Sequence, residues 1–284
     1  MVKISFSKFI TAGLLLLFLA GCINLKNVNG YSTHSLAILK NFEQVDYTFS
    51  RSCENRCAID QLEKQELFRK DCDCKANNDA DSVTLILYNA INGYFDGLAK
   101  LSADELTTYK FNTANLVEGK YGDITINKEH IASYTKISTI LLKAFTDGYR
   151  KKKIATYVGD ANEPIQTLIN AFGFTLEANL SKKLEVEKLR YQSYYFDLLK
   201  DATTSAYEKK KIIDDYNIMQ EKNIEKKNQL AIFGKGLRKI AAGHQSLYEG
   251  RNKLSANELT VLLTASSNEL KDISTAFNKL KKNN

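Results

Sequence analysis

Apolar residues recur at alternating steps of three and four positions along most of the chain, which is the period of an α-helix with one buried face. The longest run lies between Thr204 and Glu249 and keeps the spacing of a left-handed coiled-coil seam over about five heptads. Such a helix would be roughly 70 Å long and could bend at Gly234 and Gly236. The stripe consists of Ile212, Tyr216, Met219, Asn223, Lys226, Leu230, Phe233, Leu237, Ile240, His244 and Leu247.

Asn223 and Lys226 leave a polar gap in the middle of this stripe. Buried polar residues can set the register of packed helices; alternatively, the helix leaves the bundle at this point and meets solvent. In both cases Phe233 and its apolar neighbours on the stripe are expected to form the core, packed against the helices before and after this one. Gln229 and Lys239 lie off the stripe and are expected to be exposed.

Shorter stretches with the same period predict further helices. Residues 102–105 form a capping box, in which a serine and a glutamate satisfy each other's backbone amides at a helix start. Pro164 suits the first turn of a helix that follows a break at 159–163. One strand-like stretch, 121–126, has no evident partner. The expected helices span roughly 32–53, 82–100, 102–118, 127–157, 164–198 and 255–280, with a polar loop at 75–81.

Composition supports the same fold class. The 284 residues include a single proline and no tryptophan, so almost every residue can donate a backbone hydrogen bond within a helix. Lys, Leu, Glu and Ala, which favour helices, are abundant. We therefore expect an all-α fold: an elongated antiparallel helical bundle with long coiled-coil-like helices and a small disulfide-stapled segment near the N-terminus. Residues 31–80 would form the cysteine-stapled helical segment and residues 81–284 the helical bundle.

The beginning of the chain has the layout of a secretory signal. Lys3 and Lys8 give a positive start, an apolar run follows at 11–20, and no acidic residue precedes Cys22. The apolar run is short for a membrane-spanning helix, which needs roughly 20 residues. The tetrad Leu-Ala-Gly-Cys at 19–22 resembles the lipobox of bacterial lipoproteins. The alternative is an ordinary signal peptide with a chance cysteine.

The resemblance to lipoproteins implies several properties of the mature chain. Residues 1–21 would be a signal peptide that is removed, and Cys22 would carry diacylglycerol on its thiol and a further acyl chain, such as palmitate, on its amino group. Residues 22–30 would be a lipid-anchored tether. Ile23 stands where Asp would signal retention in the inner membrane, so the resemblance favours the outer membrane, facing the periplasm or the cell surface.

The charge of the chain restricts its partners. The net charge of +7 falls to +5 when residues 1–21, with Lys3 and Lys8, are removed. Basic clusters occur at 150–153 and 209–211; they are typical of a solvated helix face, or they contact anionic lipid headgroups. No nucleic-acid recognition module is visible, and nucleic acid is not an expected partner.

Four cysteines lie close together after the first predicted helix. In an exported protein an even number of thiols usually pairs. On a helix Cys53 and Cys57 lie one turn apart, and Cys72 and Cys74 have a similar separation if extended. This geometry favours the pairs Cys53–Cys74 and Cys57–Cys72. A four-thiolate metal site and a redox-active pair are the alternatives, but zinc sites favour two-residue spacers and reduced thiols.

No residue pattern indicates catalysis, so we expect no enzyme activity, no cofactor and no metal site. His34, His130 and His244 lack serine, cysteine or carboxylate partners at catalytic spacings, and His244 is interpreted as a hydrogen-bonded core residue. Tyrosines gather near the end of the helix at 164–198. Because three of them within five residues cannot all face one core, core packing explains only some of them, and the alternative is an aromatic contact surface; its residues are Tyr191, Tyr194 and Tyr195.

The sequence therefore favours a function based on contact. The expectation is a lipid-anchored cell-envelope protein that acts by protein–protein contact, in a structural, adaptor or masking role. It would associate with the membrane through Cys22 and with an envelope protein, and its oligomeric state is open. The alternative is a protective lipoprotein that inhibits an incoming toxin or hydrolase. An exposed apolar groove would favour the first hypothesis and a protruding acidic or aromatic loop the second.

Overall fold

The computed structural model describes residues 25–66, 72–103, 114–143, 150–254 and 256–282. The predicted signal peptide and Cys22 lie outside these ranges. The elements are α2 (Lys26–Lys40), the 3₁₀ helix η1 (Asn41–Gln44), α3 (Phe49–Glu63), α4 (Lys75–Ser102), β1 (Gly119–Tyr121), β2 (Ile124–Ile126), α5 (Lys128–Lys143), α6 (Arg150–Phe174), the π-helical turn η2 (Thr175–Leu180), α7 (Ser181–Lys200), α8 (Ala206–Gly250), the 3₁₀ helix η3 (Arg251–Lys253) and α9 (Asn257–Lys282).

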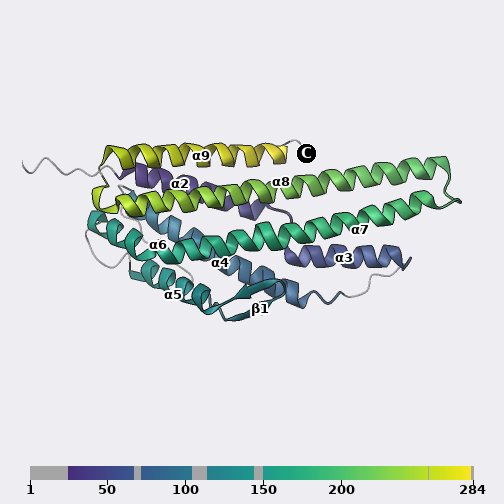
Figure 1. The fold of residues 1–284 in the computed structure, drawn as a ribbon, viewed down its shortest axis with the longest axis horizontal. Coiled ribbons are helices and arrows are strands. Elements are labelled where there is room, and N and C mark those ends of the chain that lie inside the picture. Colours follow the sequence, from purple (N-terminus) through teal and green to yellow (C-terminus); the bar gives the residue numbers. More distant parts are fainter. Residues whose placement is uncertain (1–24, 67–71, 104–113, 144–149, 255, 283–284) are drawn as a thin grey trace, which may run out of the picture.

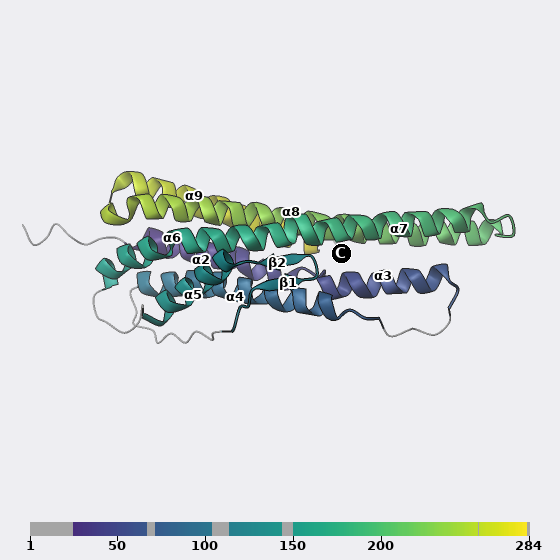
Figure 2. The same cartoon turned by 60° about the horizontal axis from the view of Figure 1, so that its bottom comes forward.

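The helices form an elongated antiparallel bundle, which confirms the predicted fold class (Figure 1). α6 continues through η2 into α7, and α8 returns along this whole helical run. α2 packs against α4, α8 and α9, while α3 packs against α4 and α7. Beyond α3, α7 and α8 project as a two-helix hairpin, as both side views show (Figures 1 and 2). No helix within the described ranges is long and apolar enough to cross a membrane.

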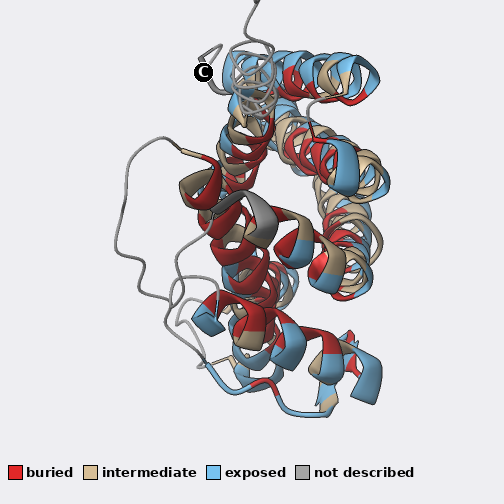
Figure 3. Ribbon diagram, turned by 90° about the vertical axis from the view of Figure 1, so that its left-hand side faces the viewer, coloured by how far each residue is buried: buried red, intermediate tan, exposed pale blue. Residues whose placement is uncertain are grey.

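One apolar core runs through the bundle. Buried residues form a single cluster from Val28 in α2 to Phe277 in α9, and in the end-on view the buried positions line the inward faces of the helices (Figure 3). The expected segments 31–80 and 81–284 therefore share one core. At its centre four aromatic rings meet from η1, α4, α6 and α8, with centroids 5.0–6.2 Å apart; they belong to Phe42, Tyr88, Phe172 and Phe233.

Helix α8 agrees closely with its predicted extent. It begins after a capping box in which Ser205 Oγ accepts from the Glu208 amide and the Glu208 carboxylate accepts from the Ser205 amide. From Leu230 to Leu247 the predicted stripe is buried. Asn223 is the first buried residue of α8, and the stripe positions before it are only half-buried. The polar gap therefore marks the place where α8 leaves the bundle.

Two expectations about α8 need correction. Gln229 is buried, at 5% exposure, and its Nε2 donates to Glu225 Oε1 at 2.8 Å. α8 packs against α2, α6, α7 and α9, so its buried face is wider than a coiled-coil seam. Gly234 and Gly236 lie within the continuous helix. A Cβ on Gly236 would come within 2.6 Å of Ile38 Cγ2, so this glycine permits the close approach of α2.

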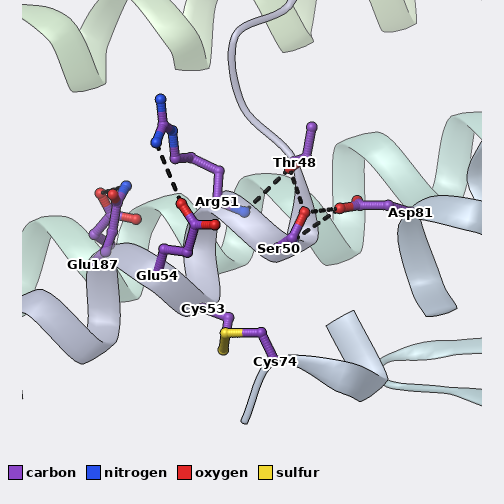
Figure 4. A network of polar contacts seen from close by, with 9 residues as sticks. Thr48, Ser50, Arg51, Cys53, Glu54, Cys74, Asp81 and Glu187 are labelled. Atoms are coloured by element: carbon purple, nitrogen blue, oxygen red, sulfur yellow. Dashed lines mark hydrogen bonds and ion pairs between the residues drawn. A yellow bond between two sulfur atoms is a disulfide. The ribbon is translucent and has the colours of Figure 1, made fainter. Parts of the chain in front are cut away.

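The N-terminal region also differs from the prediction. Residues 26–30 belong to α2 rather than to a tether: Val28 is buried, and Asn29 Nδ2 donates to the Ala99 carbonyl at 2.9 Å. The helix expected at 32–53 is divided, because α3 has its own start. Thr48 Oγ1 accepts from the Arg51 amide, and the Asp81 carboxylate accepts from the Phe49 amide and the neighbouring backbone N–H (Figure 4).

Asp81 can cap α3 because α4 begins earlier than predicted, at Lys75. The polar segment 75–81 forms its first turns instead of a loop. At the other end of α4, Ser102 is the last helical residue, and its hydroxyl donates to the Leu98 carbonyl at 2.7 Å. Residues 104–113, which include the rest of the expected capping box, lie outside the described ranges.

Two further elements depend on tertiary contacts. The strand-like stretch 121–126 folds on the residues before it, so that β1 and β2 pair antiparallel around Gly122, whose φ is +58°. Pro164 lies inside α6 rather than at a helix start. It removes one helical hydrogen bond, but Ala161, Ile165 and Leu168 around it are fully buried. Core packing on both sides keeps the helix continuous.

Candidate functional site

The cysteines staple α3 to the chain that leads into α4. The disulfides join Cys53 to Cys74 (Figure 4) and Cys57 to Cys72, with Cα–Cα distances of 5.8 and 6.3 Å. This is the pairing that the spacing favoured. The four sulfur atoms are bonded in two pairs, so they do not form a thiolate metal site. The staple fixes the start of α4 beside α3 and closes one side of a cleft.

This cleft has a volume of about 530 Å³ and lies among α3, the β1–β2 hairpin and the η2–α7 region. Its wall carries more positive than negative groups. Lys183 Nζ pairs with Asp123 Oδ2 at 2.6 Å, and Arg190 pairs with two α3 carboxylates outside the cleft. Three further cations have no ion pair with any described residue: Arg56, Lys120 and Lys182.

A buried carboxyl group lies at the inner end of the cleft. Glu187 is 7% exposed; its Oε2 accepts from Tyr47 Oη at 3.0 Å and its Oε1 from Asn55 Nδ2 at 2.8 Å. Burial raises the pKa of Glu187, and the two hydrogen bonds and the Lys226 ammonium oppose this shift. Burial and the nearby Glu187 also raise the pKa of Tyr47. No sequence pattern indicated this network, because its members are far apart along the chain.

The second candidate surface is the projecting end of α7 and α8, from Lys188 to Lys222, which we call the arm. No residue of the arm is buried. α3 accompanies α7 only as far as Arg190, which pairs with Asp60 and Glu63 at 2.7 Å each. Beyond that point, within the part of the chain that the structure describes, each helix of the arm has only the other as a neighbouring helix (Figure 2). Apolar side chains of the arm therefore face solvent.

The arm contains the tyrosines that the sequence analysis proposed as a contact surface. Tyr195 contacts the rings of Tyr191, Tyr194 and Tyr216, with centroid distances of 6.4, 5.5 and 5.6 Å. These tyrosines are half-buried against one another. The most exposed apolar side chains are others: Leu189 at 55%, Phe196 at 54%, Tyr207 at 78%, Ile213 at 46% and Ile218 at 52%. Ile213 and Ile218 lie off the predicted stripe, which is the sequence signal that could have identified them.

The histidines do not gather at either surface. His244 is fully buried; Tyr94 Oη donates to its Nε2 at 2.6 Å, and its Nδ1 donates to Asn162 Oδ1 at 2.9 Å. The Asn162 amide nitrogen donates to Gln245 Oε1, so Asn162 Oδ1 faces His244 and can only accept. Nδ1 of the neutral ring therefore carries the proton, and Nε2 accepts from Tyr94. Burial lowers the pKa of His244 to about 3. No set of three or more His, Cys, Asp or Glu side chains in the described ranges is placed to hold a metal ion.

Comparison with known proteins gives no relative: no protein-family model, curated protein or solved structure matches this chain.

Proposed function

We propose that this chain is a lipid-anchored protein of the bacterial cell envelope that binds another protein through the arm. The observation that carries the proposal is the absence of any buried residue from Lys188 to Lys222, in a segment with large exposed apolar side chains. Fully burying one such side chain contributes about 1.5–3 kcal/mol. A projecting segment that exposes several large apolar side chains is typical of interaction sites.

The position of the arm relative to the proposed anchor supports this function. α2 runs antiparallel to α8, since Tyr31 lies against Gly243 and Ile38 lies against Gly236. The start of α2 is therefore beside the C-terminal end of α8, opposite the tip of the arm (Figure 1). With 45 residues, α8 is about 68 Å long. An anchor at Cys22, three residues before Leu25, would hold the bundle end near the membrane and direct the arm away from it.

The charges of the arm indicate which kind of partner fits. Lys210 Nζ pairs with Asp214 Oδ2 at 2.5 Å, and Lys211 Nζ pairs with Asp215 Oδ2 at 3.3 Å. Because these opposite charges neutralise each other locally, the arm offers no strong electrostatic signature to an acidic surface or an anionic lipid. The partner is therefore a protein with an apolar groove, in which Phe196 and Tyr207 serve as anchor side chains.

One observation also favours the alternative function, an inhibitor of an incoming toxin or hydrolase. The arm is a protruding hairpin with exposed aromatic side chains on either side of its turn, at Phe196 and Tyr207. Insertion of such a tip into the cleft of a foreign protein would use the same residues. The two functions differ in the identity of the partner, a resident envelope protein or an external one.

Photo-crosslinking in intact cells tests the arm as the contact surface. A photoreactive amino acid at Phe196 or Tyr207 should give one dominant adduct with a different protein, and the exposed Lys136 on α5 is the matched control position. Adding Ile218→Asp should weaken the adduct at least tenfold, because a charge would enter the apolar contact. Equal adducts from Lys136 and the arm would contradict the proposal, and an adduct with a second copy of the chain would replace it with self-association.

The anchor is tested by Cys22→Ala. Without the thiol no diacylglycerol can be attached, so the variant should remain unlipidated and its precursor should not be processed at residue 22. Membrane fractionation and mass spectrometry of the N-terminal peptide measure both effects. A variant that is processed normally and stays quantitatively with the membrane would refute the resemblance to lipoproteins.

A further inference from the structure

We propose that the cleft between α3, the β1–β2 hairpin and α7 binds a small molecule that carries a phosphate group. The cleft shares only Arg190 with the arm, and the choice of a soluble ligand over a lipid headgroup rests on the proposed anchor at Cys22. Three observations support this binding: three cations line a cavity of sufficient size, the nearby carboxylates already have partners within the protein, and the elements that form the walls are rigidly attached.

The cations converge from three separate elements. Arg56 projects from α3, Lys120 from β1 and Lys182 from α7, and all three line the cleft. None of them has an ion pair within the described ranges, whereas the neighbouring Lys183 and Arg190 each do. All three side chains are exposed, so they can reach a ligand that enters the cleft. A bound anion would supply the counter-charge that no described residue provides.

The carboxylates of the cleft do not supply that counter-charge. Asp123 is paired with Lys183, and Glu187 is enclosed by Tyr47 and Asn55 at the inner end. The remaining positive charge matches a phosphate, which carries up to two negative charges and several acceptor oxygens. The Arg56 guanidinium can bind two of these oxygens at once, and the lysines act as mobile point charges.

The dimensions and the framework of the cleft favour a phosphate compound over the bare ion. A volume of about 530 Å³ lies within the range of small-molecule sites, roughly 300–1,000 Å³. The Cys53–Cys74 disulfide holds one wall, and Asn179 Nδ2 donates to the Asp123 carbonyl at 3.1 Å, which ties the β-hairpin to η2. A wall that is already fixed loses little conformational entropy on binding.

Phosphate groups in an envelope occur on soluble metabolites and on lipid headgroups, and the position of the cleft favours the soluble source. Lys226 lies above the ring of Tyr47 at the inner end of the cleft, and 24 residues separate it from Gly250 at the bundle end. This corresponds to about 36 Å along α8. A headgroup of the membrane next to that end would therefore be far from the cleft.

Calorimetric titration of the full-length protein in detergent tests the site. The probes are inorganic phosphate, glycerol 3-phosphate and dihexanoyl phosphatidylglycerol below its micelle concentration, at constant ionic strength. We expect glycerol 3-phosphate to bind, and the double variant Arg56→Gln/Lys182→Gln to bind at least tenfold more weakly. The matched control is Lys210→Gln/Lys211→Gln, which removes two exposed cations from the arm and should bind as the wild type does.

Each outcome bears on the proposal. Binding of the short-chain lipid alone, lost in the cleft variant, would support the site with a headgroup as its ligand. Absence of binding by all three probes at millimolar concentration would overturn the proposal, as would an equal loss in both double variants. Thermal unfolding of the variants should match the wild type, because exposed substitutions rarely change stability by more than about 0.5 kcal/mol.

Discussion

Phe233→Ala should lower the free energy of unfolding by about 3–5 kcal/mol, the usual cost of truncating a fully buried phenylalanine. The side chain is 1% exposed, and its ring contacts those of Phe42 and Phe172 at centroid distances of 6.0 and 5.9 Å. These contacts connect η1, α6 and α8. The truncation leaves a cavity where three elements meet, so the surrounding chain cannot easily collapse into it. Urea unfolding followed by circular dichroism measures the change.

Tyr207→Ala is the matched control for this prediction. It removes an aromatic side chain from the same helix, but at a position with 78% exposure, and should change stability by no more than about 0.5 kcal/mol. The two variants together test where α8 enters the bundle. If Phe233→Ala proved neutral while Tyr207→Ala was costly, the assignment of buried and exposed positions along α8 would be wrong.

Acid should destabilise the protein through His244. Burial lowers its pKa in the folded state from 6.5 to about 3, so below pH 6.5 the unfolded chain binds a proton that the folded protein does not. The stability contributed by the neutral ring is complete above pH 6.5 and is lost as the pH falls toward 3. The loss from this one group approaches about 1.4 kcal/mol per pH unit.

Comparison with His244→Gln isolates this contribution. The raised pKa of Glu187 makes the stability fall as the pH rises above 4.5, which is opposite to the effect of His244. This contribution is common to both proteins and cancels in their difference. The variant should be less stable than the wild type at pH 7.5, and the gap should narrow as the pH falls to 4.5. A gap between wild type and His244→Gln that stays constant with pH would refute the assignment of a buried neutral ring.

Local patterns in the sequence determined the helical class, the extent of α8 and the identity of its core. Helical periodicity and capping are short-range properties, because residues three and four apart share one face of a helix. The disulfide pairing could be inferred from the spacing of the four cysteines, although the stretch from Cys72 to Cys74 is not extended as expected: the Cys74 amide donates to the Cys72 carbonyl at 2.9 Å. His244 was recognisable as a core residue from its place on the stripe.

Only the tertiary structure decided the features that depend on distant partners. Asp81 caps the start of α3 from α4, and Pro164 is tolerated because α6 is buried on both sides of it. The cleft gathers cations from α3, β1 and α7, whose separation along the chain hides their proximity. The exposure of the arm depends on α3 ending beside Arg190, so that no third helix covers the distal parts of α7 and α8. A sequence pattern states which face of a helix is apolar, but the neighbours that cover that face are set by the packing of the whole chain.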